Sequence, residues 1–519
     1  MSSSQMNSIF GLSVLLLLPL VFAIGLLIRQ HKNLPPGPTP WPIVGNLLQL
    51  TEKPHVALAH MARTYGPLIS LRLGTQILVA ACSPSAAAQV LKTHDRLLCT
   101  RDVPHTYRIL EYTPFSLAFA VHCDDRWKAL RTVCRAELFT PRMLDAQTHV
   151  REKTVSDVVR FINRQKLGKE LQVAEMAFTA VYNMLGNVVF SRDVLPLPQT
   201  LGGDDDCQLI AASGLKHEIS RVLELGLAPN LADFYPMLAP LDIQGLNRAA
   251  TAIYGKLCRI WHEFIEERRA TGGHNGVMKK DFLDVLLSAG YEDLPLKALI
   301  SDMFVAGTDT SATLTEWTMS ELIRNPEAMK RVRDELVRVV GCRGRDGKNS
   351  VKESHLVHLD YLHACIKETL RLHPPAPLLL PRSAAETCEV MNYTIPKGCR
   401  VMVNVWAIGR DPQVWEDPLK FYPERFLDGS IDFKGRDFEF TPFGAGRRIC
   451  PGMALATRVV QLILASFVHA FEWSLPDGMK PQDLDMEEKF GLTLERANPL
   501  VLVATSSSEV GSDYVHDVC

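Results

Sequence analysis

One cysteine of this chain, Cys450, lies in a segment whose composition restricts what the surrounding backbone can do. The segment reads Phe443-Gly-Ala-Gly-Arg-Arg-Ile-Cys-Pro-Gly452. Glycines permit tight turns and the close approach of a flat ligand, and nearby arginines favour the ionised sulfur that binds metals. A lone cysteine without a neighbouring histidine argues against structural zinc, which needs four protein ligands. The segment predicts either a thiolate ligand to a metal macrocycle such as haem or a glycine-rich surface loop with an inert thiol.

A long helix is predicted between Pro295 and Pro326, because proline suits a first helical turn and marks a far end. Roughly thirty residues of helix extend about 45 Å, which is enough to cross a domain. Ala306-Gly-Thr-Asp-Thr310 lies in its middle. Glycine is unfavourable inside a helix, and threonine hydroxyls can bond their own helix and bend it. The segment is either a loosely specified core helix or a local widening where O2 fits and Asp309 and Thr310 deliver protons.

Helical periodicity dominates the remainder of the sequence. Short β-type runs appear at 68–72, 77–80, 401–405 and 500–504. The net charge of −2 gives no reason to expect a nucleic-acid partner. The pattern predicts a globular, mostly helical protein with few strands.

Five short motifs along the chain resemble those of one enzyme superfamily. The spacing Phe443-x-x-Gly446-x-Arg448-x-Cys450-x-Gly452 matches the haem-binding signature of the cytochrome P450 superfamily at every defined position. The other motifs follow in the superfamily's order: Pro35-Pro-Gly-Pro38, Ala306-Gly-Thr-Asp-Thr-Ser311, Glu368-Thr-Leu-Arg371 and Pro423-Glu-Arg-Phe426. The resemblance implies the cytochrome P450 fold, which is mainly α with a small β-rich lobe.

The resemblance assigns many of these residues to the binding of haem b (iron protoporphyrin IX). It implies that Cys450 is the axial thiolate ligand to the iron. Its loop would be shaped by Phe443, Gly446 and Gly452. Donors to the haem propionates would be Trp127, Arg131, Arg382 and Arg448, with Arg101 as a weaker candidate. Apart from the resemblance, each lone arginine is read as a solvated surface residue.

Further roles follow from the same resemblance. Asp309 and Thr310 would be catalytic, delivering protons during oxygen activation. A buried network of Glu368, Arg371 and Arg425 would hold the Cys450 loop; an isolated surface pair contributes under about 1 kcal/mol, whereas a buried network is far more costly to break. The substrate pocket would be apolar and lined by Phe304, Ala306, Leu378, Leu379 and Leu492.

The first residues predict a membrane anchor. Ile9 to Ile28 is apolar and long enough to cross a bilayer as a helix. Arg29 and Lys32 follow it, so the C-terminal side should face the cytosol. A cleaved signal peptide is the rival interpretation, but its positive charge would precede the apolar run.

Four segments are expected: a membrane anchor at 1–32, a proline-rich hinge at 33–45, a catalytic domain at 46–505 and a polar tail at 506–519. The proline-rich stretch is otherwise a linker of no special role. The resemblance implies a single-pass protein of the endoplasmic reticulum membrane with its catalytic domain in the cytosol.

No flavin-binding or nicotinamide-binding segment is evident, so the electrons should come from another protein. The resemblance implies NADPH–cytochrome P450 reductase as that partner, with NADPH acting only through it. Lys128 and Arg447 are candidate docking contacts, or unpatterned surface charges of no special role.

Several segments resemble the plant A-type branch of the superfamily, and most closely the geraniol 8-hydroxylase-type family. They include 241–245 and 486–492. The resemblance implies a monooxygenase that hydroxylates a small lipophilic plant metabolite, such as a terpenoid, alkaloid or phenolic compound, with O2. Alternatives are phenol coupling or ring-bridge formation, a hydroperoxide isomerase that needs no reductase, and a haem-binding protein that is not an enzyme.

Overall fold

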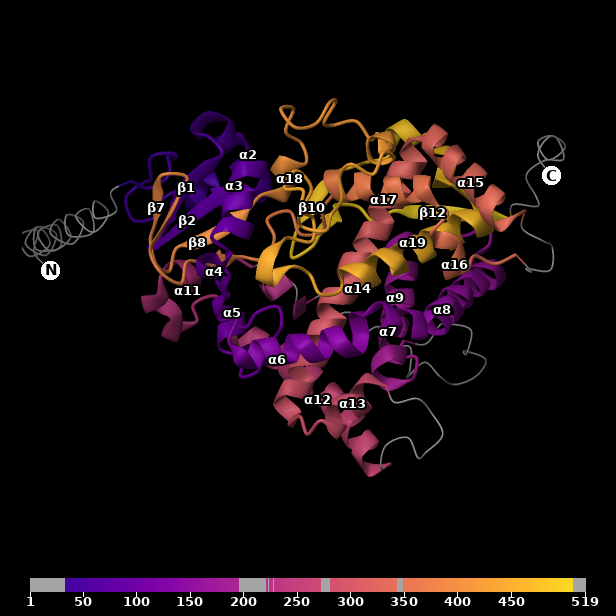
Figure 1. Ribbon diagram of the computed structural model, residues 1–519, viewed down its shortest axis with the longest axis horizontal. Helices are drawn as coiled ribbons and strands as arrows, with labels where there is room; N and C mark the ends of the chain where they lie inside the picture. Colours follow the sequence, from indigo (N-terminus) through magenta and orange to yellow (C-terminus); the bar gives the residue numbers. More distant parts are fainter. Residues whose placement is uncertain are drawn as a thin grey trace, which may run out of the picture.

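The computed structural model describes residues 33–195, 221–222, 224–226, 228–271, 281–342 and 349–506. One long helix, α14 (Asp293–Arg324), runs through the middle of the molecule and packs against α9, α17 and α19 (Figure 1). Every side chain from Ser311 to Ile323 is buried. A helix that is enclosed on all sides belongs to a core. The predicted central helix is therefore confirmed, and it ends at Arg324, shortly before Pro326, as expected.

The other helices vary widely in length. They are α2 (Pro54–Tyr65), α3 (Pro84–Ala88), α4 (Asp95–Leu98), α5 (His105–Arg108), α6 (Asp125–Cys134), α7 (Pro141–Ala146), α8 (Thr148–Phe161), α9 (Val173–Phe190), α11 (Leu231–Phe234), α12 (Leu246–Ala270), α13 (Phe282–Ser288), α15 (Pro326–Val340), α16 (Glu353–Leu356), α17 (Asp360–Leu372), α18 (Val405–Ile408) and α19 (Met453–Ala470). Among them, α9, α12, α15, α17 and α19 pack against α14. Helices outweigh strands along the described chain, so the molecule is mainly α.

The strands form small sheets. They are β1 (Leu68–Leu73), β2 (Gln76–Ala81), β3 (Thr100–Arg101), β4 (Glu170–Gln172), β5 (Arg382–Ser383), β6 (Cys388–Val390), β7 (Tyr393–Ile395), β8 (Arg400–Val403), β9 (Phe471–Ser474), β10 (Glu488–Phe490), β11 (Leu494–Arg496) and β12 (Val501–Ser506). The largest sheet has the order β1-β2-β8-β5-β3, with β2 and β8 parallel and the other neighbours antiparallel. It lies at the end of the molecule where the described chain begins (Figure 1). The predicted β-rich lobe and its β-type runs are confirmed.

Two of the described helices, α9 and α19, are apolar and long enough to cross a membrane. However, 72% and 61% of their tested windows are buried inside the protein. Both also pack against α14, so they are core helices. The predicted span Ile9–Ile28 and nearly all of the predicted tail lie outside the described residues.

Candidate active site

Cys450 lies at the end of a tight loop that its own backbone closes. The Cys450 N–H donates to the Phe443 carbonyl at 3.0 Å. Gly444 and Gly446 have φ angles of 69° and 70°, a region that favours glycine. A Cβ on Gly446 would lie 2.3 Å from the Leu91 carbonyl oxygen. Glycine at position 446 is therefore required by both the backbone angle and the close approach.

The sulfur of Cys450 lies beside the first turn of α19. The backbone N–H groups of Gly452 and Met453 donate to it. Burial raises the pKa of the Cys450 thiol, while these N–H groups and the charge of Arg131 act in the opposite direction. Donors at a helix N-terminus stabilise a thiolate. The surroundings therefore suit a sulfur that is ionised when it binds a metal.

Three buried arginines lie close together, one of them in this loop and two on neighbouring strands. They are Arg101, Arg382 and Arg448. Burial is the main cause that lowers the pKa of each, and the charges of Arg382 and Arg448 lower the pKa of Arg101 further. Arg131 is half-buried, and its guanidinium lies 5.2 Å from the centre of the Trp127 ring. All of the predicted propionate donors thus lie on elements that meet at this loop.

Backbone carbonyls accept most of the hydrogen bonds from these groups. Arg448 donates to Ala120 at 2.6 Å, and Arg131 donates to Ile449 at 2.7 Å. The Trp127 indole N–H donates to the Leu117 carbonyl at 3.1 Å. These contacts draw the loop 117–121 against the Cys450 loop.

Arg382 has a different partner, because its guanidinium pairs with the Asp95 carboxylate at 3.1 Å. Asp95 also accepts the backbone N–H of Arg447 at 3.0 Å. Its Oδ1 is the side-chain atom that a Cβ on Gly446 would meet at 2.5 Å. Asp95 therefore holds both the loop backbone and an arginine, a role that no sequence motif predicted.

The middle of α14 presents a small polar face. Ala306 is exposed, and Asp309 and Thr310 are half-buried. The Thr310 hydroxyl donates to the Ala306 carbonyl at 2.8 Å, and Ser311 bonds Gly307 in the same way at 2.9 Å. The helix is nevertheless continuous from Asp293 to Arg324. These hydroxyls make the contact by which threonine and serine can bend a helix, so the local widening stays a prediction.

Asp309 contacts a second element beyond its own helix. The hydroxyl of Thr493 donates to the Asp309 carboxylate. Thr493 is buried and directly precedes β11. The acid that was predicted on α14 is thus fixed against the β10–β11 hairpin.

Of the predicted pocket residues, Phe304 lies elsewhere than expected. Its ring is fully buried and lies 5.0 Å from Trp261 and 4.7 Å from Tyr182, centre to centre. It packs with α9 and α12, so it is a core aromatic and we exclude it from the pocket. The sequence alone could not decide between a core and a pocket position for Phe304, because an apolar residue two positions before Ala306 suits either.

The other predicted pocket residues come from separate elements. Leu378 is buried against the β1–β2 region, whereas Leu379 and Leu492 are half-buried. Leu379 has a φ of 51°, which is uncommon for a leucine and stores backbone strain. Its side chain approaches the Cys450 loop, since a Cβ on Gly444 would lie 3.6 Å from its Cδ1.

Glu368, Arg371 and Arg425 are brought together as the sequence predicted. Two nitrogens of Arg371 donate to the two oxygens of Glu368, both at 2.7 Å. Arg425 donates to the same carboxylate at 3.1 Å. Arg371 also donates to the carbonyls of Gly409 and Pro418. Both side chains of the central pair are fully buried, so their charges depend on these partners.

An aromatic series connects this network with the Cys450 loop. Arg425 lies in the short helix η8 (Pro423–Phe426). The ring centre of Phe426 lies 4.9 Å from that of Phe440, and Phe433 lies 5.3 Å from Phe443. Phe433 and Phe440 also contact edge to face. The series gives a physical route by which the ion network can hold the loop.

Asp302, one turn before Ala306, was missed by the sequence reasoning. Its carboxylate accepts the Ser116 hydroxyl at 2.8 Å and the backbone N–H groups of Leu117 and Ala118. Burial raises the pKa of Asp302 to about 6, and these donors oppose the rise. Asp302 therefore anchors the start of the 117–121 loop to α14.

The raised pKa of Asp302 predicts a pH dependence of stability. The pKa of Asp302 is about 6 in the folded protein and 3.8 in a free carboxyl. Between these two values the folded protein binds more protons than the unfolded chain. The free energy of unfolding therefore falls as pH rises through this window. From about pH 5 to about pH 7, the wild type should lose about 1 kcal/mol more of its free energy of unfolding than Asp302→Asn. Denaturant unfolding of both proteins at each pH measures this difference. Parallel pH profiles would contradict it.

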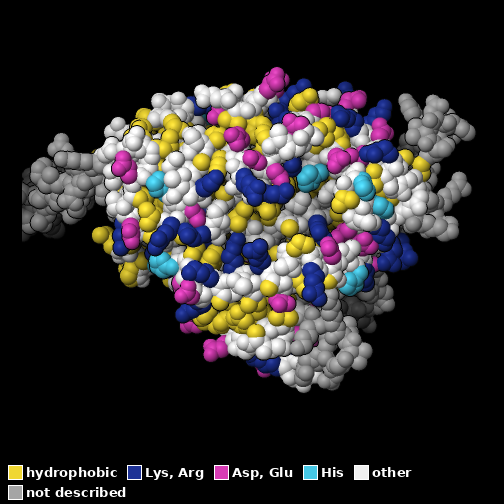
Figure 2. All heavy atoms as spheres, viewed as in Figure 1, with side chains coloured by type: hydrophobic (Ala, Val, Ile, Leu, Met, Phe, Trp, Pro, Cys, Tyr) yellow, Lys and Arg dark blue, Asp and Glu magenta, His cyan; other side chains and the backbone are white. Residues whose placement is uncertain are grey.

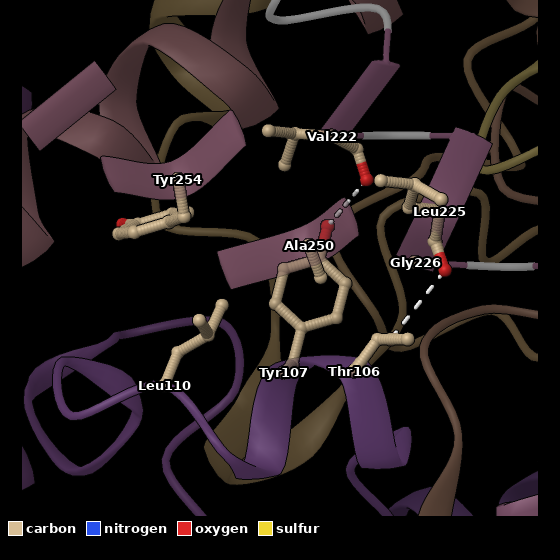
Figure 3. A pocket seen from close by; sticks show the side chains of 8 residues that line it. All are labelled: Thr106, Tyr107, Leu110, Val222, Leu225, Gly226, Ala250 and Tyr254. Atoms are coloured by element: carbon tan, nitrogen blue, oxygen red, sulfur yellow. Dashed lines mark hydrogen bonds between the residues drawn. The ribbon is translucent and has the colours of Figure 1, made fainter. Parts of the chain in front are cut away.

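A small cavity lies between α5, α12 and a stretch that contributes Val222, Leu225 and Gly226 (Figure 3). The Tyr107 hydroxyl donates to the Val222 carbonyl at 3.2 Å across one side of it. Tyr254 on α12 also lines the cavity, and its ring stacks on Tyr112 with centres 3.9 Å apart. Aromatic and aliphatic side chains dominate the lining, so this part of the molecule suits apolar groups.

Comparison with known proteins gives this arrangement a family. A family model described as Cytochrome P450 matches residues 35–503, which is most of the chain. This chain is a cytochrome P450. The P450 is a monooxygenase with a haem iron cofactor, as the motif analysis expected.

Three relatives of this P450 illustrate its place among plant enzymes. It is 50% identical to a probable (S)-N-methylcoclaurine 3'-hydroxylase isozyme 2 of Coptis japonica, over 91% of this chain and 93% of the relative. Identity to a corytuberine synthase of Coptis japonica is 45%, over 92% and 95%. Identity to a geraniol 8-hydroxylase of Catharanthus roseus is 39%, over 95% and 98%. The predicted plant A-type branch is confirmed, with higher identity to the alkaloid hydroxylase than to the terpenoid one.

The residues of this P450 fit a haem group. The thiol of Cys450 faces backbone donors, and the arginine cluster has one carboxylate partner, Asp95, among the contacts described. Two propionates would complete the neutralisation of these buried charges. Ala306, which is exposed within a core helix, offers a flat apolar surface.

Proposed function

We propose that this P450 hydroxylates a small lipophilic plant metabolite, and that an alkaloid with an aromatic ring is its substrate. The observation that carries the proposal is the 50% identity, over nearly the whole chain, to a protein named as an N-methylcoclaurine hydroxylase. Half-buried Leu379 and Leu492 and exposed Ala306 support an apolar pocket. The haem would supply activation of O2 for insertion into a C–H bond.

The protein's own residues are proposed to hold and serve the haem. Cys450 would bind the iron, and Trp127 with the arginine cluster would hold the propionates. Thr310 and Asp309 would hold and move protons on the face of α14 that Ala306 exposes. Glu368, Arg371 and Arg425 would keep the loop in place through the aromatic series.

Phenol coupling or ring-bridge formation is a second candidate for the same site. It is favoured by the 45% identity to a corytuberine synthase. Both reactions begin from the same oxidant, so the position of the substrate decides between them.

Electrons are proposed to come from NADPH–cytochrome P450 reductase. Figure 2 shows Lys and Arg side chains across the middle of the face that carries α6 and α19. Lys128 lies on α6 and Arg447 lies in the Cys450 loop, with 63% and 50% of their side-chain surface exposed. A positive face attracts an acidic partner and speeds association. These two residues remain our candidate docking contacts.

Membrane attachment is proposed through residues 1–32, followed by the hinge at 33–45, the catalytic domain at 46–505 and the tail at 506–519. An exposed apolar patch supports the proposed orientation. It consists of Trp41, Ile43, Leu48, Met237, Leu241 and Ile243. The patch comes from two segments, 41–48 and 237–243. These segments lie close together, since the Tyr235 hydroxyl donates to the Ile43 carbonyl at 3.2 Å. Such a patch suits the interface of the endoplasmic reticulum membrane.

Product identification tests the proposed function. Purified protein with the reductase and NADPH should convert a benzylisoquinoline such as N-methylcoclaurine to a product with one added oxygen. A monoterpenol such as geraniol should react far more slowly. A product that has lost two hydrogens without gaining oxygen would favour the coupling reaction. Turnover of the monoterpenol alone would overturn the choice of an alkaloid.

A further inference from the structure

A single buried hydroxyl lies between two carboxyl groups beside the middle of α14. The Thr493 oxygen is within hydrogen-bond distance of an Asp309 oxygen and lies 3.2 Å from Oε1 of Glu495. A threonine hydroxyl has one hydrogen to donate and lone pairs to accept with. If it donates to one carboxyl, the other can bond it only by donating, which requires a proton on that carboxyl.

Electrostatics identify Glu495 as the carboxyl that carries this proton. Burial raises the pKa of Glu495, and the charge of Asp309 raises it further. Glu224 acts in the same direction, whereas Lys489 and the Thr493 hydroxyl act against it. Two carboxyl groups that share one site cannot both ionise easily, so one retains its proton.

A third acid increases this effect. Glu316, two turns further along α14, is buried and accepts the Leu500 N–H at 2.7 Å. Burial raises the pKa of Glu316 to about 7, and both Glu495 and Asp309 contribute to the rise. Arg496 is the nearby cation that lowers it. The acids of α14 and β11 therefore compete for ionisation, which favours a retained proton in the group.

The hairpin that carries Thr493 is fixed in place. The Trp317 indole N–H donates to the Leu494 carbonyl at 2.8 Å, and the Leu494 N–H donates to the Pro375 carbonyl at 2.9 Å. Thr493 is buried, whereas Glu495 is half-buried and therefore accessible to water. The Thr493 hydroxyl therefore connects a solvent-accessible acid, Glu495, with Asp309, the acid beside Thr310.

We infer that Glu495 and Thr493 form a relay that reloads Asp309 with protons. In one transfer the Glu495 O–H bond breaks as its proton binds the Thr493 oxygen. The original Thr493 O–H bond breaks as that proton binds Asp309, and Glu495 then takes a proton from water. This inference rests on the proposed function, because it supplies protons to the face that Thr310 serves. Glu495 and Thr493 are positioning residues, since neither is placed against the haem or the substrate.

Infrared spectroscopy of the haem-loaded protein tests the proton directly. The wild type should show the carbonyl band of a protonated carboxylic acid, and the band should disappear reversibly as pH is raised. Asp302 and Glu316 also have raised pKa values and contribute to this band, so Glu495→Gln should lose one component of it, measured in the wild type minus variant difference spectrum. Glu487→Gln is the matched control, because this glutamate of the same segment is 68% exposed and forms a surface pair with Lys53. Its spectrum should keep the band. A wild type minus Glu495→Gln difference spectrum without a protonated-carboxyl component would overturn the relay.

Coupling between NADPH consumption and product formation tests the transfer. Thr493→Val removes the hydroxyl and keeps the shape of the side chain, so it should lower coupling several-fold and change the solvent isotope effect. Thr493→Ser should restore both, and combining Thr493→Val with Glu495→Gln should cost no more than either alone. Wild-type coupling in Thr493→Val would overturn the relay. Failure of the proposed function has a different signature from failure of the relay. In that case the wild type shows the carboxyl band but forms no oxygenated alkaloid.

Discussion

Replacing Arg371 by leucine should lower the free energy of unfolding by about 3–5 kcal/mol, because it leaves Glu368 as a buried charge without its main partner. The two side chains are fully buried and joined by two hydrogen bonds of 2.7 Å. The change also removes the donor to the carbonyls of Gly409 and Pro418. A loss of this size is a large part of the stability of a typical domain. Haem content and the denaturant midpoint of the purified protein measure it.

A surface ion pair provides the matched control. Lys153 pairs with Asp157 at 3.0 Å, four residues along α8, and 62% of its side chain is exposed. Lys153→Met removes one charge as Arg371→Leu does, but exposed pairs contribute at most about 1 kcal/mol. Similar midpoints for the two variants would contradict the assignment of the Glu368 network to the stability of the fold.

The second large effect is expected at Gly446. Gly446→Ala would place a methyl group 2.3 Å from the Leu91 carbonyl oxygen and 2.5 Å from an Asp95 oxygen. Overpacking of this kind typically costs about 1–3 kcal/mol, beyond the cost of the positive φ angle. We expect the variant to retain little haem, because the loop that carries Cys450 must move.

Gly444→Ala separates the two costs. Gly444 has nearly the same φ angle, 69°, but its Cβ would lie 3.6 Å from the nearest atom. This variant should lose only about 1–2 kcal/mol, the cost of the left-handed backbone. Thermal unfolding and haem content of both variants are the measurements. Equal losses at the two positions would show that the close approach at Gly446 has no energetic consequence.

The sequence predicted the framework because its motifs have short-range geometry. Glu368 and Arg371 are three residues apart on a helix, so their pairing follows from helical spacing. The glycines of the Cys450 loop likewise indicate a tight turn. The central helix could be bounded by Pro295 and Pro326, and both predictions agree with the structure.

Contacts between distant segments could not be read in this way. Asp95 holds the Cys450 loop although more than three hundred residues separate the two along the sequence. No motif surrounds Asp95. Thr493 meets Asp309 only because the β10–β11 hairpin packs against α14. Phe304 was placed in the pocket by position alone, yet its ring packs in the core. Burial and neighbours decide such roles, and both depend on the tertiary structure.

The central claim is that Cys450 holds the haem iron as a thiolate. The most direct measurement is the absorption spectrum of the reduced protein with bound CO. Wild type should show the Soret band typical of thiolate ligation, and Cys450→His should lose it. Cys258→Ser is the control, since this half-buried thiol lies on α12 and should be without effect. A thiolate-type band that persists in folded, haem-loaded Cys450→His would contradict the account.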